Sequence, residues 1–468
     1  MTDRALELDD IQGNILAGFN TDFQMLLALT VPEPAEPTDF RRAAKWLVEQ
    51  AQSVTVVSEV RAQRNFMKSA QSDTQTAWLC IAVGQRLLKS THPDLLMRDA
   101  AFNKGMLQTA PSALGDKTDK SKWRVGSPTA PVDIFLIVAA NNETAVTQRA
   151  DNLSASAASA GLVTSFRELA ERLDDDREHF GFRDGISQPK VIGYDSDGEM
   201  GAGNFVFGYP QKVGTNPYSP AIDPKGFTDN GSLLVFRWLT QDVRAFRQFL
   251  TDEVARLAPQ WPGLTTEHLA ALLVGRWPSG ALVKSGESQD PGGSSLENGF
   301  DFSDDTKGIS CPFAAHIRKV NPRSGPKDVA DVPRMLRRGI PFGTRFDIAP
   351  NNDDRGLAFL AFQTSVQAQF EFITRNWMNS ATNPGPGHDL LVGRSQDTRK
   401  MMINGPNGWV EVSAPSLSQW VIPTGGAYLF VPSRSALMRF ADPPTPFGFW
   451  KVKQFLFKGL DAIRGIGT

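Results

Sequence analysis

The feature that most constrains the fold of this chain is an internal repeat of one strand-and-helix pattern. The first half contains LLALTV followed by DFRRAAKWLVEQA, and the second half contains the similar LLVFRWLT followed by DVRAFRQFLTDEVA. The segments TAWLCIAVG and RGLAFLAFQ form a second matching pair. A repeated unit of this kind predicts two α+β halves built on one plan, each a sheet with helices on one face.

Hydrophobic periodicity assigns the expected elements. Apolar runs predict strands at residues 25–31, 54–60, 78–83, 133–140, 233–239, 357–362 and 428–431. Amphipathic patterns predict helices at residues 39–52, 144–160, 241–257, 265–274 and 366–378. Asp39 and Thr265 are the expected N-caps of their helices. The segments 195–224 and 279–305 are the longest expected loops, and loops of that length are usually functional or mobile.

Composition excludes several classes of function. The 468 residues carry a net charge of -2, which gives no global field to attract nucleic acid or an anionic membrane. The longest apolar runs, such as residues 134–140, are too short to span a bilayer. The chain begins MTDRALELDD, without the apolar core of a secretory signal, so we expect a cytoplasmic protein. The two cysteines form no CxxC or CxxCH motif, which excludes covalently attached haem of the c type.

The common catalytic templates are missing from the sequence. The five histidines form no HxxxH or HExxH pair, so a zinc hydrolase is poorly supported. There is no GxxxxGK[ST] phosphate-binding loop and no GxSxG nucleophile elbow. Any chemistry must therefore come from less common local segments.

Three such segments hold the candidate residues. GFRDGISQP (181–189) presents Asp184 in a glycine-bounded turn, and RRGIPFG (337–343) holds arginine in a second turn. CPFAAHIRKVNPR (311–323) places His316 among small apolar residues and shortly before three cations. That last pattern suits haem, because imidazole ligates iron and cations receive the propionates. Taken singly, each segment also fits a structural turn, a core histidine or a solvated basic stretch.

Together, and in this order, the segments resemble the dye-decolorising peroxidase family. IQGNIL (11–16) is similar to the family's N-terminal segment, and GFRDGISQP to its GxxDG motif. HIRKVNPR is similar to its proximal histidine segment, and RRGIPFG to its distal arginine turn. RGLAFLAFQTSVQAQFEFITRNWMN (355–379) resembles the strand and helix that follow. The resemblance spans nearly the whole chain and is strongest to the longer bacterial branch without an export signal.

The resemblance implies the fold, the domains and the cofactor. The fold would be α+β, with two ferredoxin-like domains of the dimeric α+β barrel type, antiparallel sheets and helices packed outside. Residues 1–225 would form the half that carries the GxxDG loop, and residues 226–468 the half that carries the haem ligand. Each chain would bind one haem b non-covalently, with its iron ligated by a histidine.

The resemblance also assigns roles by motif. His316 would be the proximal iron ligand, Asp184 the distal acid-base group and Arg337 the distal charge stabiliser. Arg337 is preferred over Arg338 because the family pattern is Arg, three residues, Pro, aromatic, Gly. The remaining cofactor contacts would be Leu357 and Phe359 on the distal face, Asp389 beside the proximal histidine, and Arg318 at a propionate. Leu390 follows Asp389 where the family usually has proline.

The implied reaction is reduction of hydrogen peroxide and oxidation of dyes, phenols or other bulky aromatic donors in single-electron steps through a ferryl intermediate. Peroxide must lose a proton at one oxygen and gain one at the other, which a positioned carboxylate can do. A fixed cation stabilises the charge on the leaving oxygen. Bulky donors do not fit a small distal pocket, so a tryptophan or tyrosine would relay electrons, with Trp377 and Tyr428 as candidates that also fit core packing.

Two other functions stay open at this point. A haem carrier or iron-releasing protein would need His316 but neither Asp184 nor Arg337. A non-haem interaction protein on a ferredoxin-like scaffold would need none of the three. The presence of the acid and the arginine together favours the peroxidase. The expected partners are hydrogen peroxide and an aromatic reductant, with no nucleic acid and no membrane, and the sequence does not indicate an oligomeric state.

Overall fold

Nine strands form one antiparallel sheet that closes into a barrel. The computed structural model describes residues 4–441 except 71–75, 174–175, 213–214, 219–220, 224–225, 293–297, 324–331, 352–353 and 417. The strand order is β10-β12-β11-β5-β1-β4-β2-β15-β9, and β12 also pairs with β9, which closes the ring. The first half supplies β1 (Phe23–Thr30), β2 (Trp78–Gly84), β4 (Ile134–Ala140) and β5 (Val163–Glu171). The second half supplies β9 (Ser232–Gln241), β10 (Leu336–Arg337), β11 (Ile340–Phe342), β12 (Gly356–Gln363) and β15 (Val421–Val431).

The two halves have the same strand order. β10 and β11 pair with the same edge of β12 in one register, so they act as a single interrupted strand. Numbered within its own half, each set of strands then reads fourth, first, third, second: β5-β1-β4-β2 and β15-β9-β12-β11. This is the arrangement expected of two ferredoxin-like units, and it confirms the fold class that the repeat predicted.

The barrel closes where the second strand of one half meets the fourth strand of the other. Phe342 of β11 lies opposite Ala170 of β5. At the other junction, Leu429 and Phe430 of β15 lie opposite Gly84 and Val83 of β2. Closure leaves the sheet without a long free edge.

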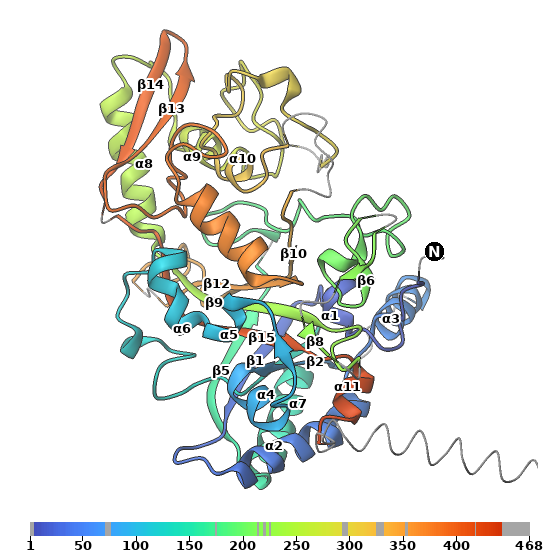
Figure 1. Cartoon of the computed structure of the whole chain (residues 1–468). Coiled ribbons are helices and arrows are strands. Elements are labelled where there is room, and N and C mark those ends of the chain that lie inside the picture. The colour runs from blue at the N-terminus through green and yellow to red at the C-terminus, as the bar shows by residue number, and fades with distance from the viewer. Residues whose placement is uncertain are drawn as a thin grey trace, which may run out of the picture.

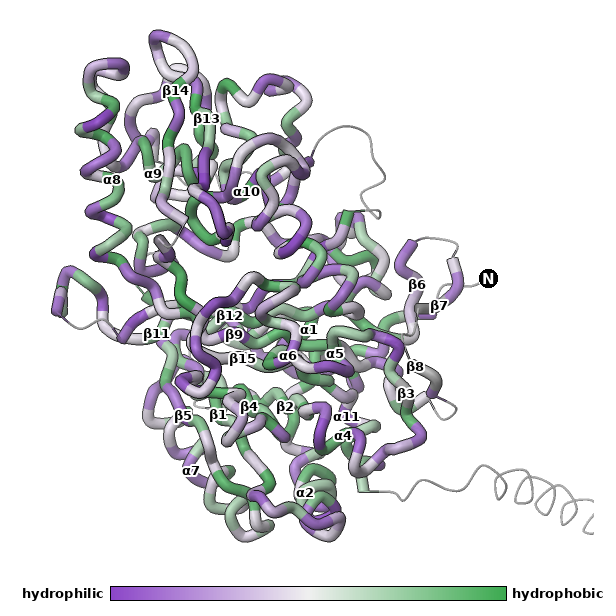
Figure 2. Tube along the Cα trace, turned by 60° about the vertical axis from the view of Figure 1, so that its left-hand side comes forward, coloured by the Kyte–Doolittle hydropathy of each residue, from purple (hydrophilic) through white to green (hydrophobic). Residues whose placement is uncertain are grey.

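Most of the barrel strands are apolar along their length because both of their faces are buried, and β5 is the exception. One set of side chains points into a shared interior, where Trp238 stacks on Phe342 with ring centroids 3.6 Å apart. The other set packs beneath helices, with Leu27, Leu136 and Val138 in the core that also contains helical residues. Figure 2 shows the green, hydrophobic tube concentrated along these central strands. Strands covered on both faces read as continuous apolar runs rather than alternating ones.

Helices cover the barrel and build a separate lobe (Figure 1). Those of the first half are α1 (Gly13–Leu16), α2 (Pro37–Gln50), α3 (Val57–Ala70), α4 (Gln85–Thr91), α5 (Ala100–Lys104), α6 (Met106–Thr109) and α7 (Glu143–Ser159). The lobe at the top of Figure 1 holds α8 (Val243–Leu257), α9 (Thr266–Val274), α10 (His316–Val320) and the hairpin of β13 (Arg399–Gly405) and β14 (Gly408–Ala414). It has its own apolar core. None of the described helices is long and apolar enough to cross a membrane.

Shorter elements complete the described chain. The π-helices η8 (Val366–Glu371) and η9 (Ile373–Met378) stand where a helix was predicted at residues 366–378. The turns of 3-10 or π-helix are η1 (Ala51–Ser53), η2 (Ala110–Leu114), η3 (Lys120–Lys122), η5 (Ala202–Asn204) and η6 (Ser303–Asp305). The remaining strands and helix are β3 (Leu96–Met97), β6 (Tyr209–Pro210), β7 (Pro217–Tyr218), β8 (Ala221–Ile222) and α11 (Arg434–Met438).

One predicted strand is wrong. Residues 54–60 were expected to be extended because of their valines, but α3 begins within this segment at Val57. Glu59 accepts a hydrogen bond from the backbone N–H of Val56 at 2.9 Å, which caps the new helix. Asp39 is also displaced from its expected place: Glu36 is the N-cap of α2, and Asp39 closes the capping box from the third helical position. Thr265 caps α9 as predicted.

Candidate functional site

The loop that carries Asp184 is held by glycine conformation and by a buried carboxylate. Gly181 and Gly185 have φ of +98° and +76°, which favours glycine on either side of Asp184. Glu178 accepts hydrogen bonds from the backbone N–H groups of Phe180 and Phe182 at 3.0 and 2.9 Å. Burial raises the pKa of Glu178 to about 7. These contacts fix the approach of the chain to Asp184.

Arg337 lies beside this loop and forms an ion pair with Asp184. Nη1 of Arg337 is 3.6 Å from Oδ1 of Asp184, and its Nη2 donates to the carbonyl of Ser187 at 2.8 Å. The side chain of Gln188 exchanges two hydrogen bonds of 3.0 Å with the backbone of Arg337. The guanidinium and the carboxylate therefore occupy one fixed arrangement, with both side chains still partly exposed.

The register of the sheet places Leu357 and Phe359 on the face that also carries Arg337. Arg337 lies opposite Ala361 on β12, and side chains two residues apart on a strand share a face. Leu357 and Phe359 are half-buried, while Ala358 and Leu360 between them are fully buried in the barrel interior. The two apolar side chains thus face outward from the barrel, toward the side of the cation.

His316, the first residue of α10, pairs with Asp389. Its Nδ1 lies 2.8 Å from Oδ2 of Asp389, whose side chain is fully buried. The other carboxylate oxygen accepts the backbone N–H groups of Leu391 and Val392 at 3.0 and 3.1 Å. Because Asp389 engages Nδ1, the Nε2 of His316 is the nitrogen left for a metal.

Lys319 joins α10 to the loop before Asp389. Its ammonium is buried and donates to the backbone carbonyls of Ser380, Asn383 and Gly385 at 2.8, 2.7 and 3.0 Å. Burial lowers the pKa of Lys319 to about 8. The lysine sets the distance between the helix that carries His316 and the loop that leads to its partner. In the sequence this lysine stands out only as one of three cations that follow His316.

Arg318 lies in a different environment from the one expected. Its guanidinium donates to Oδ2 of Asp305 at 2.8 Å and to the carbonyl of Cys311 at 2.6 Å.

Two other arginines are better placed for an anionic ligand. The guanidinium groups of Arg323 and Arg334 repel each other, and burial together with this repulsion lowers the pKa of Arg334 to about 10. Nη1 of Arg334 is buried without a hydrogen-bond partner among the described residues.

Arg323 connects the two sides of the site. It follows α10 and has φ of +42°, an unusual backbone conformation for a residue with a side chain. Its Nη2 donates to the hydroxyl of Ser187 at 2.6 Å and to Oδ1 of Asn298 at 2.6 Å. Ser187 also binds Arg337 through its carbonyl. The segment of His316 and the loop of Asp184 are therefore bridged by one arginine and one serine.

Tyr428 and Trp377, the two residues that the sequence suggested as electron relays, differ in burial. Tyr428 is 3% exposed and donates its hydroxyl to Glu371 at 3.0 Å. Trp377 is half-buried in η9, which packs against α10, and its ring meets that of Phe372 edge-on at 5.4 Å. Tyr428 cannot touch a bulky donor directly, because almost none of it reaches the surface.

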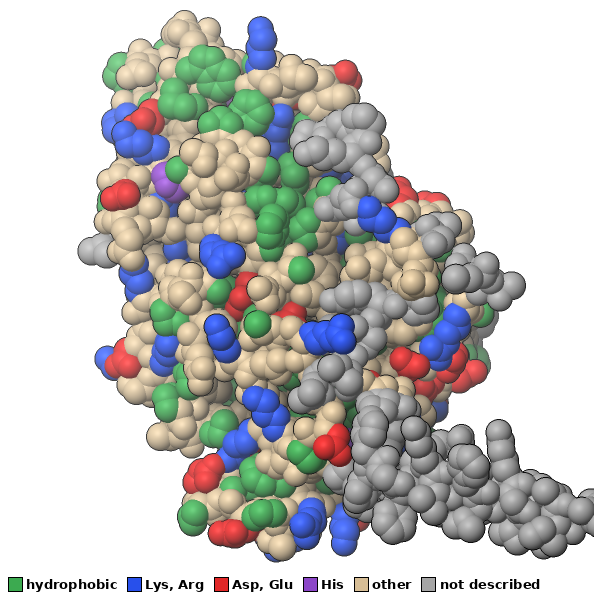
Figure 3. Space-filling model, in the orientation of Figure 1, with side chains coloured by type: hydrophobic (Ala, Val, Ile, Leu, Met, Phe, Trp, Pro, Cys, Tyr) green, Lys and Arg blue, Asp and Glu red, His purple; other side chains and the backbone are tan. Residues whose placement is uncertain are grey.

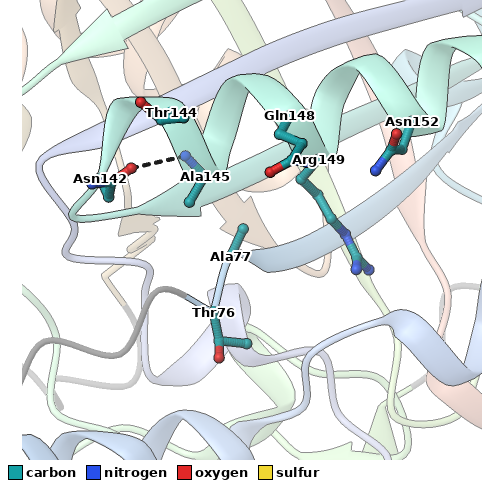
Figure 4. A pocket seen from close by; sticks show the side chains of 8 residues that line it. All are labelled: Thr76, Ala77, Asn142, Thr144, Ala145, Gln148, Arg149 and Asn152. Carbon is teal, nitrogen blue, oxygen red and sulfur yellow. Dashed lines mark hydrogen bonds between the residues drawn. The ribbon is translucent and has the colours of Figure 1, made fainter.

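A separate hollow opens at the start of α7 and carries no acid-base chemistry. It has a volume of about 520 Å³ and is lined mainly by amide, hydroxyl and methyl groups, with Arg149 as its one titratable side chain among the lining residues (Figure 4). Asn142 at its rim accepts the N–H of Ala145 at 2.9 Å, an ordinary helix cap. The catalytic candidates lie instead around Arg337 and His316.

Comparisons of the whole chain with known proteins give matches to one family. Residues 10–170 match the family model described as the DyP dimeric alpha+beta barrel domain, and residues 290–389 match the C-terminal model of Dyp-type peroxidases. A multifunctional dye peroxidase of Amycolatopsis is 31% identical over 463 residues, which cover 92% of this chain and 96% of that protein. A dye-decolorising peroxidase of Mycetinis scorodonius is 29% identical over 92% of this chain and 87% of that protein.

Solved structures agree with the sequence relatives. An ancestral D-type dye-decolorising peroxidase is 28% identical, with a TM-score of 0.78 over 93% of this chain and 99% of that one. The structure of a fungal enzyme of this type from Auricularia auricula-judae is 26% identical, with a TM-score of 0.76 over 94% of this chain and all of that one. The fold, the order of the motifs and these likenesses over nearly full length show that the chain belongs to the dye-decolorising peroxidase family.

Proposed function

We propose that this chain is a haem-dependent peroxidase that reduces hydrogen peroxide and oxidises dyes and other bulky aromatic donors one electron at a time. The observation that carries the proposal is the link between two functional pairs. His316 with Asp389 forms a metal-ligand pair, Asp184 with Arg337 forms an acid-base and charge-stabilising pair, and Arg323 with Ser187 bridges the two. A carrier of haem would have no use for the second pair.

The residues fit one non-covalent haem b. His316 would hold the iron through Nε2, and its side chain, 25% accessible, is partly open to a ligand. Arg334 would bind one carboxylate of the cofactor, because its Nη1 is buried without a hydrogen-bond partner among the described residues. Arg323 would bind the other, because its hydrogen bonds to Ser187 and Asn298 leave its positive charge unneutralised. Arg318 is a weaker candidate for this role because Asp305 already neutralises it. When bound, haem supplies a redox-active iron that accepts electrons from donors and passes them to peroxide.

The side chains around the distal face would do the proton chemistry. Asp184 would take the proton from the inner oxygen of peroxide and return it to the outer oxygen, which must leave as water. Arg337 would stabilise the negative charge that develops on that leaving oxygen. Leu357 and Phe359 would exclude water from the same face, which strengthens the interaction with the arginine.

Asp389 would act from the opposite side. A carboxylate that accepts the Nδ1 proton of His316 makes the imidazole a stronger donor to the metal. The buried carboxylate keeps its orientation through the N–H groups of Leu391 and Val392.

We also propose that the chain divides near residue 225 into a half with the distal loop (1–225) and a half with the histidine ligand (226–468). A cytoplasmic location stays a prediction.

The experiment that tests the function compares His316→Ala with His388→Ala. His388 is next to Asp389 but accepts the backbone N–H of Lys400, so it serves as a matched control. We expect wild type and His388→Ala to bind haem with a Soret band and to turn over peroxide with a dye. His316→Ala should lose both. Haem binding without any reaction with peroxide in the wild type would instead show a carrier.

A further inference from the structure

Three aromatic rings form a continuous row through the upper lobe. Trp261 meets His268 edge-on with ring centroids 5.5 Å apart, and His268 stacks on Trp277 at 5.2 Å with an angle of 24° between the ring planes. Both spacings are within the range of direct aromatic contact. His268 is buried, and burial lowers its pKa, so the middle ring is neutral at neutral pH.

The inner end of the row reaches the helix that carries His316. Trp277 is fully buried and belongs to the same apolar core as Ala314 and Ala315, the two residues before His316. α9 ends against α10, because Gly275 lies so close to Ile317 that a Cβ added there would be 2.5 Å from its Cγ1. The ring of Trp277 is therefore separated from His316 by packed side chains and not by solvent.

The inner tryptophan also has a proton acceptor. Its indole Nε1–H donates to Oε2 of Glu287 at 3.1 Å. Glu287 is half-buried and also accepts the backbone N–H of Lys284 at 3.1 Å. A tryptophan that loses an electron becomes a far stronger acid at its indole N–H. A hydrogen-bonded carboxylate therefore allows it to release and recover this proton without movement of the chain.

The outer end of the row meets the surface beneath the β13-β14 hairpin. Trp261 is half-buried, and Gly405 lies so close to it that an added Cβ would be 3.0 Å from its Cε3. Asn407 at the hairpin turn donates to the carbonyl of Gln260 at 3.1 Å, which holds the hairpin at this place. Hydrophobic side chains gather on this upper part of the molecule (Figure 3), and an aromatic donor could rest against them.

We propose that Trp261, His268 and Trp277 conduct electrons from aromatic donors at the surface to the proximal side of the site. The inference rests on the proposed peroxidase function, which supplies the oxidant: the haem centre after it has reacted with peroxide. Trp277 gives one electron to that centre and its Nε1 proton to Glu287, which leaves a neutral indolyl radical. An electron from Trp261 crosses the His268 ring and reduces this radical, and the proton returns from Glu287. A phenol or arylamine then gives one electron to Trp261 and releases its own proton to solvent.

This row differs from both relays that the sequence suggested. Tyr428 contacts Phe370 edge-on at 6.2 Å, and Phe370 lies 6.0 Å from Phe359, but this path ends in the interior. Among the described residues, the ring of Trp377 contacts that of Phe372 alone, and its indole N–H has no hydrogen bond to a carboxylate. Only the row from Trp261 combines partial exposure, ring contact and a proton acceptor in the described part of the chain.

The test uses the haem-loaded protein and three tryptophan variants: Trp261→Phe, Trp277→Phe and the control Trp409→Phe. Trp409 is 46% exposed on the same hairpin but outside the row. Peroxide is added without a donor, the tryptophanyl radical is recorded by electron paramagnetic resonance, and a nitroso spin trap marks its position for peptide mass spectrometry. We expect trap adducts at Trp261 in wild type and Trp409→Phe. Trp277→Phe should lose the adduct at Trp261, and Trp261→Phe should lose oxidation of a sulfonated anthraquinone dye.

Glu287→Gln is a control for misfolding of the variants at buried positions. Its amide oxygen can still accept the hydrogen bond from Trp277, but it cannot take up the proton. It should retain haem and lose the neutral indolyl signal. Adducts at Trp377 or Trp409 alone, or an unchanged radical in Trp277→Phe and Glu287→Gln, would overturn the relay. The haem of every variant should still react with peroxide, and failure of the wild type in that step would instead contradict the proposed function.

Discussion

His316 and Asp389 are 73 positions apart in the chain, yet Nδ1 of the histidine lies 2.8 Å from Oδ2 of the aspartate. The carboxylate is fully buried and holds its position through two backbone N–H groups. A charge fixed on this side of the imidazole should lower the reduction potential of an iron held by Nε2, because it favours the more positive state of the metal.

Replacing that charge tests the relationship directly. We expect Asp389→Asn to keep haem but to raise the reduction potential of its iron, measured by spectroelectrochemical titration. Asp397→Asn is the control, because Asp397 is an exposed carboxylate eight residues away along the chain. Equal potentials for Asp389→Asn and wild type would show that the carboxylate does not act on the metal through His316.

Removing either member of the Asp184 and Arg337 pair should slow the reaction with peroxide. Asp184→Asn loses the proton carrier and Arg337→Leu loses the charge stabiliser, and each should cost roughly two to three powers of ten in rate. Stopped-flow absorbance of the haem after peroxide addition measures this step without a dye. If both variants react at rates near that of wild type, the distal assignment is wrong.

Lys319→Met should destabilise the proximal side. The substitution leaves the carbonyls of Ser380, Asn383 and Gly385 without their buried donor, and the unfolding free energy should fall by at least about 2 kcal/mol. Urea unfolding measures the change, and retention of haem on a desalting column reports whether Asp389 has moved. Lys307→Met, at an exposed lysine, should behave like wild type.

His179 should make stability depend on acid pH. Burial lowers its pKa to about 4, and its Nε2 lies 2.8 Å from the carbonyl of Phe342. An unfolded histidine takes up a proton near pH ~6.5. The folded state therefore keeps its full stability above that pH and loses part of it as the pH falls toward 4.

The melting temperature of wild type and His179→Gln between pH 7 and pH 4 checks this expectation. The variant should be less stable at pH 7 but should lose less of its stability on acidification. Parallel curves for the two proteins would mean that another group causes the acid sensitivity.

The repeated pattern predicted both halves of the barrel because their central strands are apolar on both faces. β5 escaped prediction since only Phe166 and Ala170 of Val163–Glu171 are buried and polar residues interrupt its apolar ones. Its place in the sheet comes from pairing with β1 and β11. At residues 54–60 the valines favoured a strand, but the contact of Glu59 with Val56 starts a helix instead. The helix cap by Glu59 therefore outweighs the β-propensity of the valines in this segment.

The site was predicted by motif and not by spacing. Sequence segments predicted His316, Asp184 and Arg337 as site residues, but the hydrogen bonds of Ser187 and Arg323 between their segments appear only in the folded chain. The expected role of Arg318 could not be judged from sequence, because its partner Asp305 lies 13 residues away along the chain, at the end of η6. Arg334 carries no sequence signal, since its burial beside Arg323 depends on the fold.

The closed barrel has a consequence for how the chain is made. When synthesis has reached the end of β5, the nascent polypeptide holds β1, β2, β4 and β5, with β2 and β5 still waiting for partners in β15 and β11. The unpaired edges of β2 and β5 can pair with strands of other chains, including the same half of a neighbouring nascent chain. Closely spaced ribosomes on one messenger RNA would thus favour domain-swapped pairs of chains unless the C-terminal half emerges quickly enough to close its own barrel.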